Sequence, residues 1–202
     1  MATTTTEDPL TPPQLTAGAQ RILETAAGLF YSRGIHAVGV DTIADESGRT
    51  KRTLYDRFGS KDALVVTYLQ VRHHTWWSRL ERRLAALDVD DLDGRSAARD
   101  RVLAIVDSYS LDAGAEAERG CAFVNAAAEL PTDHPGRAVI RAHKARVVDL
   151  LAGILDNGGH PAPEALAEHA FLILEGAIVH RGLDGDDHRL QSARAFIGDL
   201  LA

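Results

Sequence analysis

Residues 49–61 concentrate basic side chains in a protein whose net charge is −7. This stretch holds one acidic residue against five basic ones, which are Arg49, Lys51, Arg52, Arg57 and Lys61. Thr50, Thr53 and Tyr55 add hydroxyl groups among them. Such side chains neutralise phosphates, and arginine and lysine also form hydrogen bonds with the major-groove edge of guanine. The chemistry that this stretch predicts is the binding of double-stranded DNA.

The rest of the chain is acidic, which restricts where DNA can bind. Residues 63–202 hold 15 Lys and Arg residues against 21 Asp and Glu residues. An acidic surface repels DNA except where the basic stretch meets it. This favours a docked, oriented DNA reader over a protein that coats DNA.

The apolar residues around the basic stretch have the spacing of a helix-turn-helix. Val40 and Ile43 lie on one face of a short helix at about 40–47, and Ala44 is small where a second helix crosses closely. Gly48 can take the positive φ of a tight turn between the two helices.

The second helix of this pair is expected at about 51–57. Thr50 can cap it through its hydroxyl, and Leu54 and Phe58, four apart, can bury one face against the first helix. The basic residues are left on the opposite face.

The run from residue 17 to 64 resembles the tetracycline-repressor (TetR) family. That family has a first helix ending in an aromatic residue and Gly, a Val-x-x-Ile-Ala helix, a Gly turn, a Thr-Leu-Tyr-x-x-Phe recognition helix and a Ser-Lys-x-x-Leu start to a long helix. The matching residues here are Ile22, Ala26, Leu29, Phe30, Gly34, Val40, Ile43, Ala44, Gly48, Thr53, Leu54, Tyr55, Phe58, Ser60, Lys61, Ala63 and Leu64. The rest of the chain resembles the family only in helical character and length.

Two residues depart from the family pattern. Gly39 replaces the usual Thr or Ser ahead of the second helix, so it can cap the helix but makes no side-chain contact with a phosphate. Arg49 replaces an apolar turn residue, and it is either a solvated arginine with a buried stem or an additional DNA contact.

The chain as a whole predicts an all-α fold of about nine helices, because alanine and leucine are abundant and no β alternation occurs. A Thr- and Pro-rich, disordered tail is expected at 1–13. With the resemblance, residues 14–62 are expected to form a three-helix, helix-turn-helix DNA-binding domain, and residues 63–202 a helical ligand-binding and dimerisation domain. The DNA contacts are expected from Arg49, Thr50, Lys51, Arg52, Thr53, Tyr55 and Lys61.

The last two expected helices, near 163–181 and 188–201, carry broad apolar stripes. Such width means either core alone or core together with an interface. The resemblance favours a homodimer, since TetR-type regulators typically pair through their last two helices as a four-helix bundle. A two-fold dimer presents two recognition helices about 34–36 Å apart to a palindromic operator.

The larger domain also holds polar and aromatic residues among apolar neighbours. Each one alone is compatible with an ordinary core or surface residue, whereas the set together favours a small-ligand pocket. The resemblance places an inducer between the fourth, fifth, seventh and eighth helices. The pocket residues predicted are Trp76, Tyr109, Phe123, Asn125 and His143, with Tyr109 and Asn125 as the first polar contacts and the aromatic Trp76 and Phe123 as apolar walls.

Other chemistries lack their sequence signatures. Nine histidines include no pair four apart and no Glu-x-x-His, so no metal site is expected. No catalytic elbow, Walker loop or dinucleotide fingerprint occurs, so neither an enzyme nor a cofactor is expected. Cys121, the one cysteine, is either a small buried hydrophobe or a redox-active thiol at a helix start. A single cysteine, no signal peptide and no long apolar run predict a cytoplasmic protein with no membrane partner.

These patterns together predict a ligand-responsive transcriptional regulator. It would be a repressor that binds a palindromic operator as a homodimer and is released by a small effector. One alternative is a DNA-binding regulator without a small ligand, which is switched by its abundance or by a protein partner. A helical enzyme or carrier with an incidental helix-turn-helix is a third, disfavoured reading.

Overall fold

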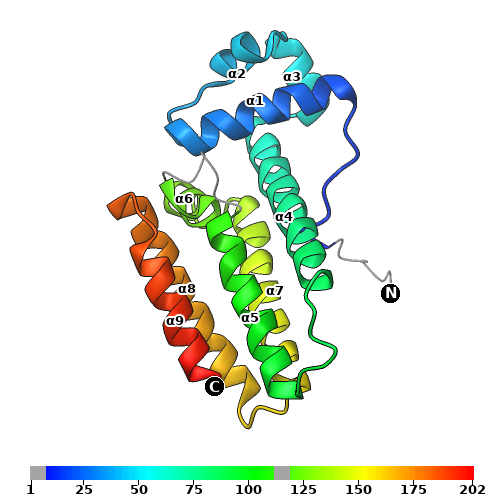
Figure 1. Ribbon diagram of the computed structural model, residues 1–202. Coiled ribbons are helices and arrows are strands. Elements are labelled where there is room, and N and C mark those ends of the chain that lie inside the picture. Colours follow the sequence, from blue (N-terminus) through cyan, green and yellow to red (C-terminus); the bar gives the residue numbers. More distant parts are fainter. Residues whose placement is uncertain (1–7, 112–118) are drawn as a thin grey trace. The chain divides into compact units, whose positions relative to one another are not determined.

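A computed structural model describes residues 8–111 and 119–202, and the predicted all-α fold is confirmed there (Figure 1). The helices are α1 (Ala17–Arg33), α2 (Val40–Ser47), α3 (Lys51–Phe58), α4 (Lys61–Ala85), α5 (Gly94–Leu111), α6 (Ala122–Glu129), α7 (Gly136–Asn157), α8 (Pro163–Asp184) and α9 (His188–Leu200). α6 begins after Cys121, and α8 continues beyond the end expected at Arg181 to a left-handed Gly185 cap. The expectation for residues 1–7 falls outside the described residues.

The chain divides into two compact units. The first unit comprises the residues up to Thr75 together with Asn125–His143, and the second comprises Trp76–Val124 and Lys144–Ala202. These units do not follow the boundary expected at residue 62.

The first unit is built around α1, which packs on both α2 and α3. Thr16 caps the start of α1 by accepting a hydrogen bond from the Ala19 amide, and Gly34 ends the helix at a φ of 92°. The core is apolar, with Ile22, Ile43 and Leu54 all fully buried. The three helices therefore hold α3 with one face inward and one face free.

Contacts with the rest of the first unit begin before residue 14, within the segment expected as a tail. Leu10 is buried, and the Pro9 carbonyl oxygen accepts a hydrogen bond from the Gln70 side chain at 3.0 Å. Leu10, which lies between two prolines, packs against the first unit although the segment around it is mostly polar.

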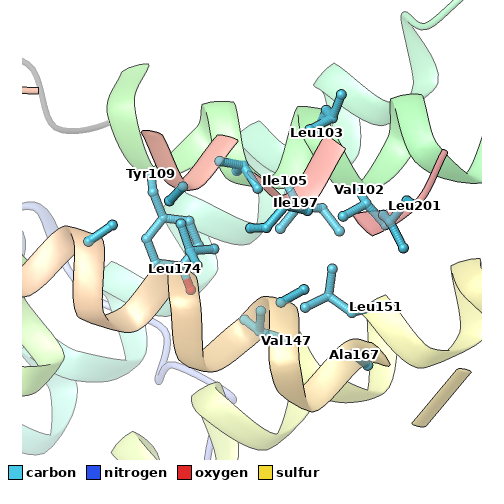
Figure 2. Close-up of a cluster of buried hydrophobic side chains, with 14 of the residues drawn as sticks. Val102, Leu103, Ile105, Tyr109, Val147, Leu151, Ala167, Leu174, Ile197 and Leu201 are labelled. Atoms are coloured by element: carbon cyan, nitrogen blue, oxygen red, sulfur yellow. The ribbon is translucent and has the colours of Figure 1, made fainter. Parts of the chain in front are cut away.

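The second unit has one apolar core contributed by α4, α5, α7, α8 and α9. Figure 2 labels core residues from α5, α7, α8 and α9. α9 packs against both α5 and α8. Gly198 lies at the contact with α5, where Arg99 donates a hydrogen bond to its carbonyl oxygen at 2.9 Å. None of the described helices is both long and apolar enough to cross a membrane.

Candidate nucleic-acid interface and effector-site residues

The turn between α2 and α3 has the geometry that its sequence predicts. Gly48 adopts the left-handed conformation, with φ 65° and ψ 32°, and the Arg49 amide donates to the Ala44 carbonyl oxygen at 2.9 Å. The hydroxyl of Thr50 then caps α3 by accepting from the Thr53 amide at 3.1 Å. The turn and the cap together fix the direction in which α3 leaves α2.

One face of α3 is buried and the other is exposed. Leu54 is fully buried and Phe58 is half-buried, as their four-residue spacing predicts. Lys51 and Arg52 are exposed at the start of the helix, and Tyr55 is exposed one turn later. Arg49 and Arg57 are also exposed, whereas Thr53 is half-buried. A helix start with exposed basic side chains can enter a major groove and contact base edges.

The two basic residues at the start of α3 are paired with carboxylates of the same unit. Lys51 Nζ lies 2.7 Å from an oxygen of Asp41 on α2, and this hydrogen bond raises the pKa of Lys51. Arg52 Nε lies 3.8 Å from Asp56 one turn along α3. Arg52 remains the freer of the two, with 90% of its side-chain surface exposed.

Lys61 is engaged within the protein. Its ammonium donates a hydrogen bond to the Ile35 carbonyl oxygen at 2.6 Å and lies 6.0 Å from the centroid of the Phe30 ring. Partial burial lowers the pKa of Lys61. This geometry gives Lys61 a role in fixing the loop between α1 and α2, and its contact with a DNA phosphate stays a prediction.

Glu129, at the end of α6, holds the same loop from a second side. Its carboxylate accepts a hydrogen bond from the His36 amide at 2.8 Å, and the His36 ring donates to its backbone carbonyl oxygen at 2.6 Å. The two residues are 93 positions apart, and no sequence pattern connects them. Sequence reasoning therefore missed this clasp on the helix-turn-helix.

The predicted effector residues are divided between the two units. In the second unit, the Trp76 and Tyr109 rings meet edge to face at 5.4 Å, and Phe123 is buried on α6. Asn125 and His143 belong to the first unit. The buried His143 ring lies with its Nδ1 atom 2.9 Å from that of His73 on α4, so it has a partner inside the protein.

A polar cluster in the second unit surrounds a lysine that sequence reasoning missed. Lys144 Nζ lies 2.6 Å from a carboxylate oxygen of Glu175 and 3.4 Å from the Cys121 sulfur. The rings of Tyr109 on α5 and Phe171 on α8 flank this ammonium, each with its centroid 5.9 Å from Nζ. An isolated lysine in α7 carries no periodic signal, because its partners come from α5, α8 and the residue before α6.

The approach of the chain to Cys121 depends on two glycines. Gly120 has a φ of 68°, and a Cβ atom at Gly182 would lie 2.9 Å from the Gly120 nitrogen. Backbone therefore packs directly on backbone between the start of α6 and α8. In the described parts of the chain, no three His, Cys, Asp or Glu residues gather in a way that could hold a metal ion.

A capped recognition helix with an exposed basic face, held in a helix-turn-helix, is the defining part of a DNA-binding transcriptional regulator. Residues 22–67 match the family model described as bacterial regulatory proteins, tetR family. The transcriptional activator FasR of Mycolicibacterium smegmatis is 45% identical over 53 residues, which are 26% of this chain and 24% of that protein. The chain thus aligns with about a quarter of this curated relative.

Two solved structures are similar over nearly their whole length. A TetR-family transcriptional regulator from Streptomyces coelicolor is 28% identical, with a TM-score of 0.77 over 91% of this chain and 94% of that one. A TetR-type regulator from Streptomyces avermitilis is 26% identical, with a TM-score of 0.75 over 92% of this chain and 98% of that one. The chain therefore has a TetR-type DNA-binding domain, and its fold is that of TetR-family transcriptional regulators.

Proposed function

We propose that this protein is a repressor that binds a palindromic operator as a homodimer and leaves it when a small effector binds. Residues 14–62 read the DNA, and residues 63–202 bind the effector and dimerise. The observation that carries the proposal is the start of α3, where Thr50 caps the helix and exposed Lys51 and Arg52 follow at once. The protein acts where the chromosome lies, in the cytoplasm.

Each basic residue of this surface has a distinct part in DNA binding. Lys51 and Arg52 contact base edges, because the first turn of a recognition helix lies deepest in the major groove. Tyr55 contacts a backbone phosphate from the second turn, and Arg49 contacts one from the turn before α3. The Lys61 ammonium has two donor hydrogens besides the one that it gives to Ile35, and these contact the DNA phosphate backbone.

Exposed apolar side chains on the last two helices support the homodimer. On α8, Leu172, Val179 and Leu183 are seven and four residues apart and are 63%, 39% and 72% exposed. On α9, Phe196 and Leu200 are four apart and are 57% and 37% exposed. Large apolar residues in such a row are stabilised when a second copy covers them.

An effector is supported by the buried polar groups of the second unit, in particular the Tyr109 hydroxyl. The alternative is a regulator without a small ligand. Because the relative FasR is an activator, the test must also distinguish repression from activation. A binding assay with DNA, followed by a reporter assay, separates these cases.

The test begins with an inverted repeat sought in the DNA beside the gene. Fluorescence anisotropy should show saturable binding of two protomers per repeat, while a scrambled duplex of equal length binds much more weakly and with a similar salt dependence. Equal affinity for both duplexes at physiological salt would contradict operator reading. Compounds that shift the melting temperature of the protein are then titrated into the protein–DNA complex to measure release. A reporter fused to the promoter shows whether the protein represses or activates transcription.

A further inference from the structure

A buried hydroxyl on α5 has no partner among the described residues. Tyr109 is 8% exposed and lies in the core of the second unit beside Leu174 (Figure 2). Its hydroxyl oxygen is fully buried, and no described group forms a hydrogen bond with it. An unpaired buried hydroxyl destabilises a folded protein. Phenylalanine would therefore be the better core residue here unless the hydroxyl has a use.

The groups beside this hydroxyl are charged and mutually paired. Lys144 uses one N–H toward Glu175 at 2.6 Å and one toward the Cys121 sulfur at 3.4 Å. An ammonium has three N–H donors, so among the described residues one donor of Lys144 is left over. The Tyr109 ring lies beside this pair, with its centroid 5.9 Å from the Lys144 ammonium nitrogen. Burial raises the pKa of Tyr109, so the phenol stays protonated and is a second free donor.

We infer that Tyr109 and Lys144 form the polar end of the effector site, and that the effector presents a neutral carbonyl oxygen on an apolar or aromatic body. This inference rests on the proposed function, because it names the chemistry of the effector whose existence that function assumes. A carbonyl oxygen has two lone pairs and accepts from both free donors at once.

The charges of the cluster select against ionic effectors. A carboxylate would be drawn to Lys144 but repelled by Glu175, which already neutralises that ammonium at 2.6 Å. A cationic effector would be drawn to Glu175 but repelled by Lys144, whose pKa is raised by its neighbours and which stays charged. A neutral carbonyl group adds no charge to the cluster.

The aromatic walls of the cluster suit a flat, apolar body. The Trp76 ring lies 5.4 Å from Tyr109, and the Phe171 ring lies 5.9 Å from the Lys144 ammonium. Aromatic rings around a few convergent polar groups are typical of small-ligand sites.

The test measures binding of four probes of one size to the full-length protein without DNA. Equilibrium dialysis is carried out with acetophenone, ethylbenzene, benzoate and benzylammonium. The variant Tyr109→Phe keeps the ring and removes only the hydroxyl. It should weaken acetophenone binding about five- to tenfold and leave ethylbenzene binding unchanged. Tyr68→Phe, the same change at a buried tyrosine of the first unit, should leave acetophenone binding unchanged.

Two further readouts keep the result independent of folding defects. The melting temperature of free Tyr109→Phe should equal or exceed that of the wild type, because an unpaired buried hydroxyl is removed. Glu175→Gln should strengthen benzoate binding severalfold, because the repelling charge is lost while a side chain of the same shape remains.

Three outcomes overturn the inference. They are an equal effect of Tyr109→Phe on acetophenone and ethylbenzene, tighter binding of benzoate than of acetophenone to the wild type, and no binding of any probe at millimolar concentration. Operator release is measured separately on the same samples. Carbonyl-selective binding without operator release would support the site and refute the proposed response to an effector. Operator release by compounds whose binding does not depend on Tyr109 would support that response and refute the site.

Discussion

Replacing Gly39 with serine should stabilise the protein and strengthen its binding to DNA. Gly39 is the N-cap residue of α2, and no side chain supplies the cap hydrogen bond there. Its φ of −80° and ψ of 160° suit any residue, and a Cβ atom at this position would meet nothing within 4 Å. A serine hydroxyl can therefore accept a hydrogen bond from a free amide in the first turn of α2 without strain.

The size of the effect follows from two contributions. A serine cap exceeds a glycine cap by a few tenths of a kcal/mol, and loss of glycine's freedom in the unfolded chain adds about 0.4–1 kcal/mol. The sum is about 1 kcal/mol, which for a protein of this size raises the melting temperature by roughly 2–4 °C. If the hydroxyl also contacts a phosphate, affinity should rise roughly two- to tenfold on all DNA sequences alike.

Gly48→Ser is the matched control for this substitution. Its Cβ atom would also meet nothing within 4 Å, but its φ is +65°, so the side chain costs about 1–2 kcal/mol in backbone strain. Differential scanning fluorimetry should move the two variants in opposite directions, and anisotropy on operator and scrambled DNA measures the second effect. Melting temperatures that fall together would refute the capping argument, and a gain confined to the operator would refute the phosphate contact.

Five further substitutions test the other contacts. Arg52→Ala should weaken operator binding by about 1–3 kcal/mol and relax the preference at one base pair per half-site. The control Arg57→Ala should weaken binding to all DNA sequences equally. If Arg52→Ala also weakens binding to all sequences equally, Arg52 is a phosphate contact. Lys61→Met should lower the melting temperature by a few degrees, at about 1 kcal/mol for the hydrogen bond to the α1–α2 loop, and an unchanged salt slope would remove it from the phosphate contacts. Phe196→Glu should convert the proposed homodimer to a monomer in light scattering, and a variant that stays dimeric would place the interface elsewhere. Burial and the charge of Arg95 lower the pKa of His160. Because the folded state then binds fewer protons than the unfolded state, the stability present above about pH 6.5 is lost as the pH falls below that value. His160→Gln should reduce the fall of the melting temperature at acid pH, and an unchanged fall would assign it to other groups.

The helix-turn-helix was predictable because all its determinants are local. The Gly48 turn, the Thr50 cap and the burial of Leu54 each depend on residues within a few positions, and each is confirmed. The helical character of the rest followed from composition and period for the same reason. The contacts of individual side chains with DNA stay predictions.

The polar cluster of the second unit could not be predicted, because it depends on distant pairs. Lys144 meets Glu175 31 residues away and Cys121 23 residues away. Tyr109 was singled out as an aromatic residue with a polar group, but its lack of a partner is a property of the packed core alone. His143 shows the converse, since its ring belongs to a histidine pair in the first unit that no spacing rule indicates.

The carboxylates that hold Lys51 and Arg52 have a consequence for how the protein finds its site. If Lys51 and Arg52 bind DNA as proposed, Asp41 and Asp56 compete with DNA for these side chains at a fixed and high effective concentration. A chromosome offers millions of wrong sites, and time spent on them delays arrival at the right one. Because each random contact must first displace an internal carboxylate, we expect short residence on non-specific DNA. At the proposed operator, contacts with base edges add to those with phosphates and offset the loss of the internal ion pairs. We therefore expect the acidic neighbours of the recognition helix to shorten the search.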